Sequence, residues 1–525
     1  MTNSINELLQ TEVILLVGAN STEAHPVTGY RIKQAVKDGA KLIVIDPRKI
    51  ELERYADLWL RIRPGSDVAM LNGLAHVILR DELWDQNFVQ ERSEGFEEWR
   101  GSVEKYTPEY VAKITGVKPE LIGQAAHLYA GAKRATTVYA MGITQHTSGT
   151  NNVLGIANLA ILTGNVGREG TGVAPLRGQN NVQGACDMGC LPNYYPGYQL
   201  VQEAEVRQKF EKFWALKQPD AAGLTMTEMF EAAGQADIKA MYIMGENPVL
   251  SDPDSNHVIE ALEKLDFLVV QDIFMTETAE KADVVLPAAS FAEKEGTFTN
   301  TERRIQLVRK AIPCIGQSKP DWEIITALAK QMGYNWNYSN AEQIMSEIVK
   351  ITPSYGGISY HRLEEKGLQW PCPNPDHPGT KFLHADKFAR GRGKFHLVDY
   401  LEPHEVPDAD YPLWLLTGRM LYQFHTGSMS RRSNALEEIY SEELAMLHPD
   451  DASALGIEDA ETVRVSSRRG EVETKVQVTD HVPRGSIFMT FHFAETPTNK
   501  LTINATDPIC KIPELKACAV KVEKI

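Results

Sequence analysis

The sequence predicts an α/β protein with two pseudo-repeated doubly wound (Rossmann-like) domains and a C-terminal β-barrel domain. Apolar strands alternate with amphipathic helices from residue 13, a similar strand pattern returns about 226 residues later, and period-2 strands dominate the last part of the chain. At 525 residues the chain is also too long for one hydrophobic core. The expected domains are 1–179, a second α/β domain at 180–342, an irregular connecting segment at 343–394, and the barrel at 395–525.

Strand and helix signals alternate in the first domain. Residues 13–20 (VILLVGAN) and 41–48 (KLIVIDPR) are apolar runs typical of strands that are buried on both faces. Residues 30–40 carry apolar side chains at helical spacing, and residues 66–79 combine a serine cap, Ser66, with one apolar face. The order strand, helix, strand, helix indicates a doubly wound sheet.

An internal repeat relates the first two domains. In the first copy one strand ends at Gly18 and the next ends at Asp46, 28 residues further on. In the second copy the corresponding residues are Gly245 and Asp272, which are 27 residues apart. The asparagines two positions after each glycine match, and so does an Ala-Asp pair that ends 11 residues after each aspartate. Three markers in the same order predict a true repeat.

The repeat has a chemical interpretation. A glycine at the carboxyl end of a strand lets a ligand approach the backbone, and doubly wound sheets bind their ligands at that edge. A carboxylate there can accept two hydrogen bonds from the N1–H and N2–H edge of guanine, or from ribose hydroxyls. Two copies therefore predict two nucleotide sites. The alternative is that Asp46 and Asp272 are turn residues or helix caps.

Composition argues against several classes of protein. A net charge of −16 disfavours nucleic acid as a partner, because phosphate binding needs a basic face. No apolar run is long enough to span a membrane and no secretory signal is visible, so we expect a cytoplasmic location. Six cysteines without paired C-x-x-C spacing predict neither a disulfide framework nor a zinc or iron–sulfur site within these residues.

Three other motifs have simple interpretations. Residues 112–130 look like a helix-turn-helix, but the acidic chain favours a plain αα-hairpin with Gly116 at its turn. The glycine-rich residues 164–173 lack the Lys-Ser/Thr pair of a phosphate-binding loop. His25, in the sequence EAHP, is interpreted as a loop or packing histidine and not as a base.

The last part of the chain has strand character. Residues 462–480 form two period-2 runs around a turn at Arg469-Gly470, which predicts a β-hairpin. Residues 485–493 predict a further strand. Four prolines within residues 371–382 indicate irregular chain before this domain.

Several segments together carry a resemblance to a known family. They are GANSTEAHP with IDPRKIE, LTGNVGREGTGVAPLRGQNNVQGACDMG, MGENP, the run from VVQDIF to NTERR, and TGRMLYQFHTGSMSRRS. They resemble the molybdenum or tungsten oxidoreductases that bind two molybdopterin guanine dinucleotides, specifically the catalytic subunit of formate dehydrogenases. The resemblance runs along all 525 residues. The RGQNNVQGACDMG block is its most specific part, since nitrate reductases of the same superfamily carry a different sequence there.

The resemblance implies a reaction and a set of site residues. The reaction is oxidation of formate to CO2, or CO2 reduction, at a Mo or W centre clasped by both pterins. Arg177 would hold formate with a forked charged donor, Gly178 would let the backbone approach a pterin, and Gln179 would add a neutral donor. Three further sets of residues would bind the two cofactors. They are, for one dinucleotide, Gly18, Asn20, Asp46, Arg48, Gly65, Asp67, Met141, Gly142 and Gln145; for the other, Gly245, Asn247, Gln271, Asp272 and Ser290; and, from the barrel, Gly418, Arg419, Gln423, His425, Thr426 and Asn499.

The resemblance also implies parts that these residues do not contain. Family members carry a four-cysteine segment for a 4Fe-4S cluster, then a Cys or selenocysteine that ligates the metal, with a His directly after it. We expect both upstream of Met1, through an in-frame UGA codon, a split gene or a shortened gene. The second domain would then be incomplete and the chain inactive by itself. Electron-transfer subunits, or hydrogenase or diaphorase subunits, are the expected partners.

Two other functions compete with this one. The first is a cofactor-free structural scaffold of the same fold, against which both repeat aspartates and Arg177 argue. The second is an NAD-dependent dehydrogenase, against which both strand-end turns argue, because VGANST and MGENPV do not follow the pattern G-x-G-x-x-G.

Overall fold

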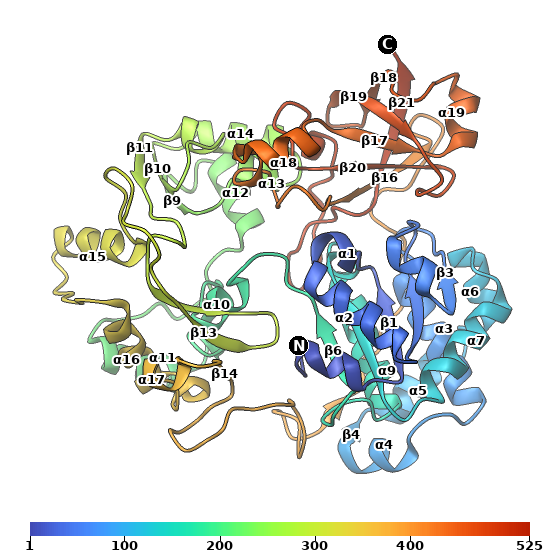
Figure 1. Cartoon of the computed structure of the whole chain (residues 1–525), viewed down its shortest axis with the longest axis horizontal. Coiled ribbons are helices and arrows are strands. Elements are labelled where there is room, and N and C mark those ends of the chain that lie inside the picture. Colours follow the sequence, from blue (N-terminus) through green and yellow to red (C-terminus); the bar gives the residue numbers. More distant parts are fainter. The chain divides into compact units, whose positions relative to one another are not determined.

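The computed structural model describes residues 1–525, which form two compact units (Figure 1). The first unit consists of Met1–Gly178, Leu250–Asn256 and Phe382–Ile525. The second consists of Gln179–Val249 and His257–Lys381. The first unit therefore contains both the N-terminal sheet and the C-terminal barrel.

A parallel five-stranded sheet forms the centre of the N-terminal part, in the order β3-β2-β1-β5-β6. Its first strand is buried on both faces, because Val13, Leu15 and Val17 pack with α3, α7 and α9, whereas Ile14 and Leu16 pack with α2. The predicted doubly wound arrangement is confirmed. The strands are β1 (Val13–Val17), β2 (Lys41–Ile45), β3 (Leu58–Leu60), β5 (Ala135–Tyr139) and β6 (Gly172–Pro175). The helices are α1 (Ser21–Ala24), α2 (Pro26–Lys37), α3 (Asp67–Arg80), α4 (Gln86–Arg92), α5 (Phe96–Val103), α6 (Pro108–Thr115), α7 (Pro119–Ala130), α8 (Met141–Thr144) and α9 (Gly149–Leu162).

The ends of helices α2, α3 and α6 follow local sequence signals to different degrees. Helix α2 begins four residues before the predicted start, because Pro26 occupies its first position, where no backbone N–H is needed. Gly116 ends α6 with φ +78°, which confirms the predicted αα-hairpin of α6 and α7. Ser66 precedes α3 as predicted, but its hydroxyl does not cap the helix, since it donates to the Arg63 carbonyl at 2.7 Å.

The second unit contains a three-stranded parallel sheet, β11-β10-β9, and an antiparallel sheet, β12-β13-β14. One face of the parallel sheet covers a core with α12 and α14, while Tyr242, Met244 and Phe267 on its other face are exposed. The strands are β7 (Tyr194–Tyr195), β8 (Gln199–Leu200), β9 (Ala240–Met244), β10 (Phe267–Asp272), β11 (Val284–Pro287), β12 (Gly296–Thr299), β13 (Arg304–Val308) and β14 (Leu368–Gln369). The helices of this region are α10 (Val182–Asp187), α11 (Ala204–Trp214), α12 (Met226–Gly234), α13 (Pro248–Ser251), α14 (Ser255–Glu263), α15 (Asp321–Gln331), α16 (Ala341–Ile351) and α17 (Tyr360–Leu363).

The predicted repeat is confirmed at the level of single hydrogen bonds. The Gly18 N–H donates to the Ile45 carbonyl at 3.0 Å, and the Gly245 N–H donates to the Gln271 carbonyl at 2.9 Å. In each copy the Asp of the Ala-Asp pair accepts a bond from the start of the second strand. Asp57 accepts from the Leu42 N–H at 2.9 Å, and Asp283 accepts from the Leu268 N–H at 2.7 Å. The two copies share one backbone geometry.

The C-terminal part forms a closed six-stranded barrel in the order β16-β20-β17-β19-β18-β21. The predicted hairpin is confirmed as the antiparallel pair β18 and β19, and the predicted strand at 485–493 is β20. The strands are β16 (Leu413–Gly418), β17 (Leu444–Leu447), β18 (Thr462–Ser466), β19 (Glu471–Val478), β20 (Ser486–Thr490) and β21 (Cys518–Lys524). Helices α18 (Asn434–Ile439) and α19 (Pro449–Leu455) accompany them, and the short pair β4 (Ser93–Glu94) and β15 (Gly393–Lys394) ties the preceding chain to the N-terminal part.

The segment 343–394, expected to be irregular, includes α17, β14 and most of α16. Apolar side chains of these elements pack around Ile305 of β13, and this packing makes them regular. No helix is long and apolar enough to cross a membrane.

Candidate cofactor-binding site

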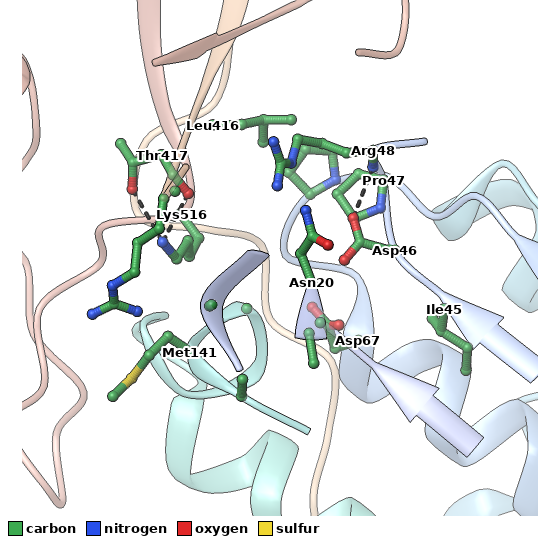
Figure 2. A pocket seen from close by; sticks show the side chains of 18 of the residues that line it. Asn20, Ile45, Asp46, Pro47, Arg48, Asp67, Met141, Leu416, Thr417 and Lys516 are labelled. Carbon is green, nitrogen blue, oxygen red and sulfur yellow. Dashed lines mark hydrogen bonds between the residues drawn. The ribbon is translucent and has the colours of Figure 1, made fainter. Parts of the chain in front are cut away.

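A cavity lies in the first unit, where the carboxyl ends of β1, β2 and β5 face the end of barrel strand β16 (Figure 2). Doubly wound sheets bind ligands at this edge. The lining residues are Gly18, Ala19, Asn20, Glu23, Ala24, His25, Ile45, Asp46, Pro47, Arg48, Ile62, Pro64, Gly65, Asp67, Ala140, Met141, Gly142, His146, Leu416, Thr417, Gly418, Arg419 and Lys516.

Close backbone packing forms the floor of the cavity. Gly18 has φ +53°, and the Gly142 N–H donates to its carbonyl at 3.0 Å. A Cβ atom added at Gly18 would lie 2.7 Å from the Gly142 carbonyl carbon. Only glycine fits at this strand end, because a side chain would meet backbone and would need a left-handed conformation.

Three half-buried basic side chains, Arg48, Arg419 and Lys516, line the cavity. The Arg48 guanidinium stacks 3.7 Å from the centre of the Phe488 ring, and the Lys516 ammonium donates to the Thr417 carbonyl at 2.8 Å (Figure 2). Burial lowers the pKa of Arg419 to about 10 and holds the pKa of Lys516 well below its usual value. None of the three forms an ion pair with a carboxylate within 4 Å. Three cations without ion pairs favour an anionic ligand.

Three carboxyl groups share the cavity wall. Burial raises the pKa of Glu23 and of Asp46, and raises the pKa of Asp67 to about 6. Asp46 accepts a hydrogen bond from the Arg48 N–H at 2.9 Å through Oδ1, so its role as a turn residue is real. Its Oδ2 atom is not used in that turn. The Oε2 atom of Glu23 is buried without a hydrogen-bond partner. These acceptors suit a ligand that carries N–H or O–H donors.

A buried histidine joins the N-terminal part to the C-terminal tail. The Nδ1 atom of His146 lies 3.4 Å from Glu514 Oε1, and its Nε2 atom lies 3.0 Å from the Gly142 carbonyl and 4.0 Å from Asp67 Oδ2. The carboxylates of Glu514 and Asp67 outweigh burial and raise the pKa of His146. This network fixes α8 beside the cavity.

The loop after β6 carries Arg177. The Leu176 N–H donates to the Tyr139 carbonyl at 2.8 Å, and the Leu176 side chain is buried in the core. His25 Nε2 bonds the Arg177 carbonyl at 2.9 Å. Burial raises the pKa of the Tyr139 hydroxyl to about 12, and the nearby Arg177 charge opposes that rise. The backbone is therefore held on both sides of the half-buried Arg177, at the Leu176 N–H and at the Arg177 carbonyl.

The cavity gathers most of the first predicted set and two residues of the barrel set. Gln145, which ends α8, does not line it. Gln423 instead donates to the Tyr440 carbonyl at 2.8 Å, and Asn499 donates to the Leu250 carbonyl at 2.7 Å. His425 and Thr426 also lie outside the lining.

The second predicted set lies in the second unit, at the ends of β9, β10 and β11. Asn247 accepts from the Thr278 hydroxyl at 2.7 Å, and Gln271 donates to Asp321 at 2.7 Å. Asp272 accepts from the Ile273 N–H at 2.6 Å and from the Phe274 N–H at 3.2 Å, in a turn like that of Asp46. Gly245 has a positive φ of +64°, and its counterpart Gly18 also has a positive φ. The Ser290 N–H donates to Glu293 at 2.7 Å.

Several cavity residues were missed from the sequence. Glu23, His146 and Lys516 are examples, and His25 was interpreted as a packing residue. The one available signal for Lys516 was a lysine within the apolar run ELKACAV. His, Cys, Asp and Glu side chains form no group of three or more that could hold a metal ion.

The comparisons with known proteins agree with this geometry. Residues 1–331 match the family model described as molybdopterin oxidoreductase. The chain belongs to the molybdopterin oxidoreductase family. Residues 413–519 of this molybdopterin oxidoreductase match the molydopterin dinucleotide binding domain, which covers the barrel and supplies Gly418, Arg419 and Lys516 to the cavity.

This chain is similar along its length to several named enzymes. It is 51% identical to the F420-dependent formate dehydrogenase subunit alpha of Methanocaldococcus jannaschii, covering 100% of this chain and 78% of the relative. It is 42% identical to formate dehydrogenase H of Escherichia coli, with 100% and 74% covered. The assimilatory nitrate reductase catalytic subunit of Bacillus subtilis is 37% identical, with 99% and 76% covered.

A solved structure confirms the fold of the molybdopterin oxidoreductase chain. Acetylene hydratase from Pelobacter acetylenicus superposes with a TM-score of 0.79 at 22% identity, covering 100% of this chain and 79% of that one.

The cavity fits a molybdopterin cofactor. The three cations suit phosphate, and the acceptors of Asp46 and Glu23 suit ring N–H groups.

Proposed function

We propose that this chain is the catalytic portion of a formate dehydrogenase, which oxidises formate to CO2 or reduces CO2. The observation that carries the proposal is Arg177, a forked cation whose backbone is fixed at Leu176 and at its own carbonyl. The names of the relatives from M. jannaschii and E. coli support the same reaction.

Two molybdopterin guanine dinucleotides would serve this reaction, one per repeat. Arg48, Arg419 and Lys516 would bind the diphosphate of the first, and Oδ2 of Asp46 would accept from its guanine. Gly245 and Asp272 would serve the second, because their backbone geometry repeats that of Gly18 and Asp46. When bound, the dinucleotides would hold a Mo or W centre that accepts the electrons from formate.

The chain itself would bind and orient the substrate. The Arg177 guanidinium offers two parallel N–H donors to the two oxygens of formate, which fixes the direction of the C–H bond. Gln179 would add a neutral donor beside it. The low polarity around Tyr139 strengthens these charge-assisted bonds, because burial excludes water.

The metal-ligating Cys or selenocysteine and the 4Fe-4S cluster remain predictions. The relatives named as alpha subunits support the presence of further subunits, and the relative from M. jannaschii is named as F420-dependent.

The test is Arg177→Lys in the complete, cofactor-loaded enzyme. Lysine keeps the charge but loses the fork, so we expect kcat/KM for formate to fall by a factor on the order of 10 to 1,000. Pterin and metal content should match the wild type. Nitrate reduction by the wild-type enzyme, measured in parallel, checks the competing activity suggested by the B. subtilis relative. Unchanged formate turnover in the lysine variant would refute the role of Arg177.

A further inference from the structure

We propose that His25 is a positioning residue that sets the orientation of Arg177 by holding its backbone carbonyl. This inference rests on the proposed function for its kinetic consequence, but the contact itself is independent of it. The sequence EAHP alone suggested only a packing histidine.

The hydrogen-bond pattern fixes the tautomer of His25. Nε2 lies 2.9 Å from the Arg177 carbonyl oxygen, which can only accept, so Nε2 carries the proton. Nδ1 is buried without a hydrogen-bond partner. Burial, with Arg419 nearby, lowers the pKa of His25 to about 4. The ring is therefore neutral at pH 7 and donates through one nitrogen only.

The backbone of His25 is itself held firmly. His25 ends α1 and precedes α2, and its N–H donates to the Ser21 carbonyl at 3.1 Å. Its carbonyl accepts from the Gly29 N–H at 2.9 Å, and Pro26 fixes the next φ. A Cβ atom at Gly29 would lie 2.9 Å from the Ser21 carbonyl oxygen, so the two helices are in close contact. The backbone at this junction therefore holds the His25 ring in a fixed position.

The loop that carries Arg177 contacts His25 through the Arg177 carbonyl, between two other fixed points. Leu176 anchors the loop on one side, and on the other an added Cβ at Gly178 would lie 3.3 Å from the Arg419 guanidinium. Between these points His25 holds the carbonyl of the peptide that leaves Arg177. Without that bond the peptide plane can rotate, and the guanidinium at the end of a long side chain would shift with it. Displacements of about 1 Å in a positioning group cost on the order of 100-fold in rate.

The experiment uses three variants of the complete enzyme. Gln places an amide nitrogen where His25 carries Nε2, so His25→Gln keeps the donor. His25→Asn is too short to reach. His127→Asn, on the exposed face of α7, is the control for losing a surface histidine. We expect His25→Asn to lower kcat/KM for formate by about 10- to 100-fold, His25→Gln to restore most of it, and pterin content to be unchanged in all three.

Two readouts separate positioning from a merely structural role. Hydrogen exchange should accelerate in a peptide spanning residues 172–181 of His25→Asn and nowhere else. In the Arg177→Lys background, His25→Asn should have almost no further effect on kcat/KM, because its role passes through Arg177.

The outcomes distinguish this inference from the proposed function. A wild-type enzyme that does not oxidise formate refutes the function, while the exchange result still decides the contact. An active wild type with an equally active His25→Asn refutes the inference. So do unchanged exchange at 172–181, pterin loss in His25→Asn, or additive effects with Arg177→Lys.

Discussion

At the scale of single residues, the Asp46 side chain can both stabilise a turn and bind a ligand. Its Oδ1 atom accepts from the Arg48 N–H in a turn, which leaves Oδ2 for a ligand. Asp46→Asn keeps a carbonyl oxygen for the turn and replaces the other oxygen by a donor. We expect this change, and Asp272→Asn in the second copy, to weaken guanine nucleotide retention by roughly 1–3 kcal/mol each. The measurement is guanine nucleotide released per pterin after denaturation of the purified enzyme. Full retention in both variants would contradict the guanine prediction and leave the aspartates as turn residues only.

At the scale of elements, the barrel contains a carboxyl group that resists ionisation. Glu443, next to β17, is buried and accepts from the Thr490 N–H at 2.7 Å and from the Thr490 hydroxyl at the end of β20. Burial raises its pKa from 4.5 to about 7. The unfolded chain ionises Glu443 above pH 4.5 while the folded barrel keeps the proton. Its stabilising contribution is therefore complete below pH 4.5 and is lost by about 1.4 kcal/mol per pH unit up to pH 7.

The expected result is a pH-dependent gain in stability for Glu443→Gln. The Tm difference from the wild type should grow in favour of the variant between pH 5 and pH 7 and then level off. Glu442→Gln is the matched control, because Glu442 is exposed and pairs only with Lys475 at 2.9 Å. A Tm difference that stays flat with pH would show that Glu443 is ionised in the folded barrel.

At the scale of the whole molecule, two units with separate cores contain the two copies of one repeat. Gly18→Ala and Gly245→Ala form a matched pair, since both glycines have positive φ. A Cβ at Gly18 would meet backbone at 2.7 Å, whereas a Cβ at Gly245 would meet nothing within 4 Å. We expect Gly245→Ala to cost about 1–2 kcal/mol from the left-handed backbone, and Gly18→Ala to cost about 1–3 kcal/mol more.

Calorimetry of the full chain tests this pair. We expect more than one unfolding transition, with Gly18→Ala shifting one and Gly245→Ala shifting another, because each glycine belongs to a different unit. Equal shifts of a single common transition would contradict independent units.

The sequence alone determined the fold class, the repeat and much of the set of residues that lines the cavity. These follow from local signals. Strands buried on both faces read as apolar runs, and the carboxyl ends of parallel strands meet at one edge, so Gly18, Asn20 and Asp46 had to lie close together. The hairpin of β18 and β19 was equally local. The residues taken from the family resemblance alone were brought together less well, since Gln423 binds the Tyr440 carbonyl and Asn499 binds the Leu250 carbonyl of α13.

Only the tertiary structure decided which distant residues complete the cavity and what charge they carry. Lys516 lies about 470 positions after Asp46 in the sequence and still lines the same cavity, because the barrel closes over the sheet. Burial raises the pKa of Asp67 to about 6 and lowers that of His25 to about 4. Desolvation depends on every neighbour of a group at once. The contact of His25 with the Arg177 carbonyl spans 152 positions, and no local pattern in either segment encodes it.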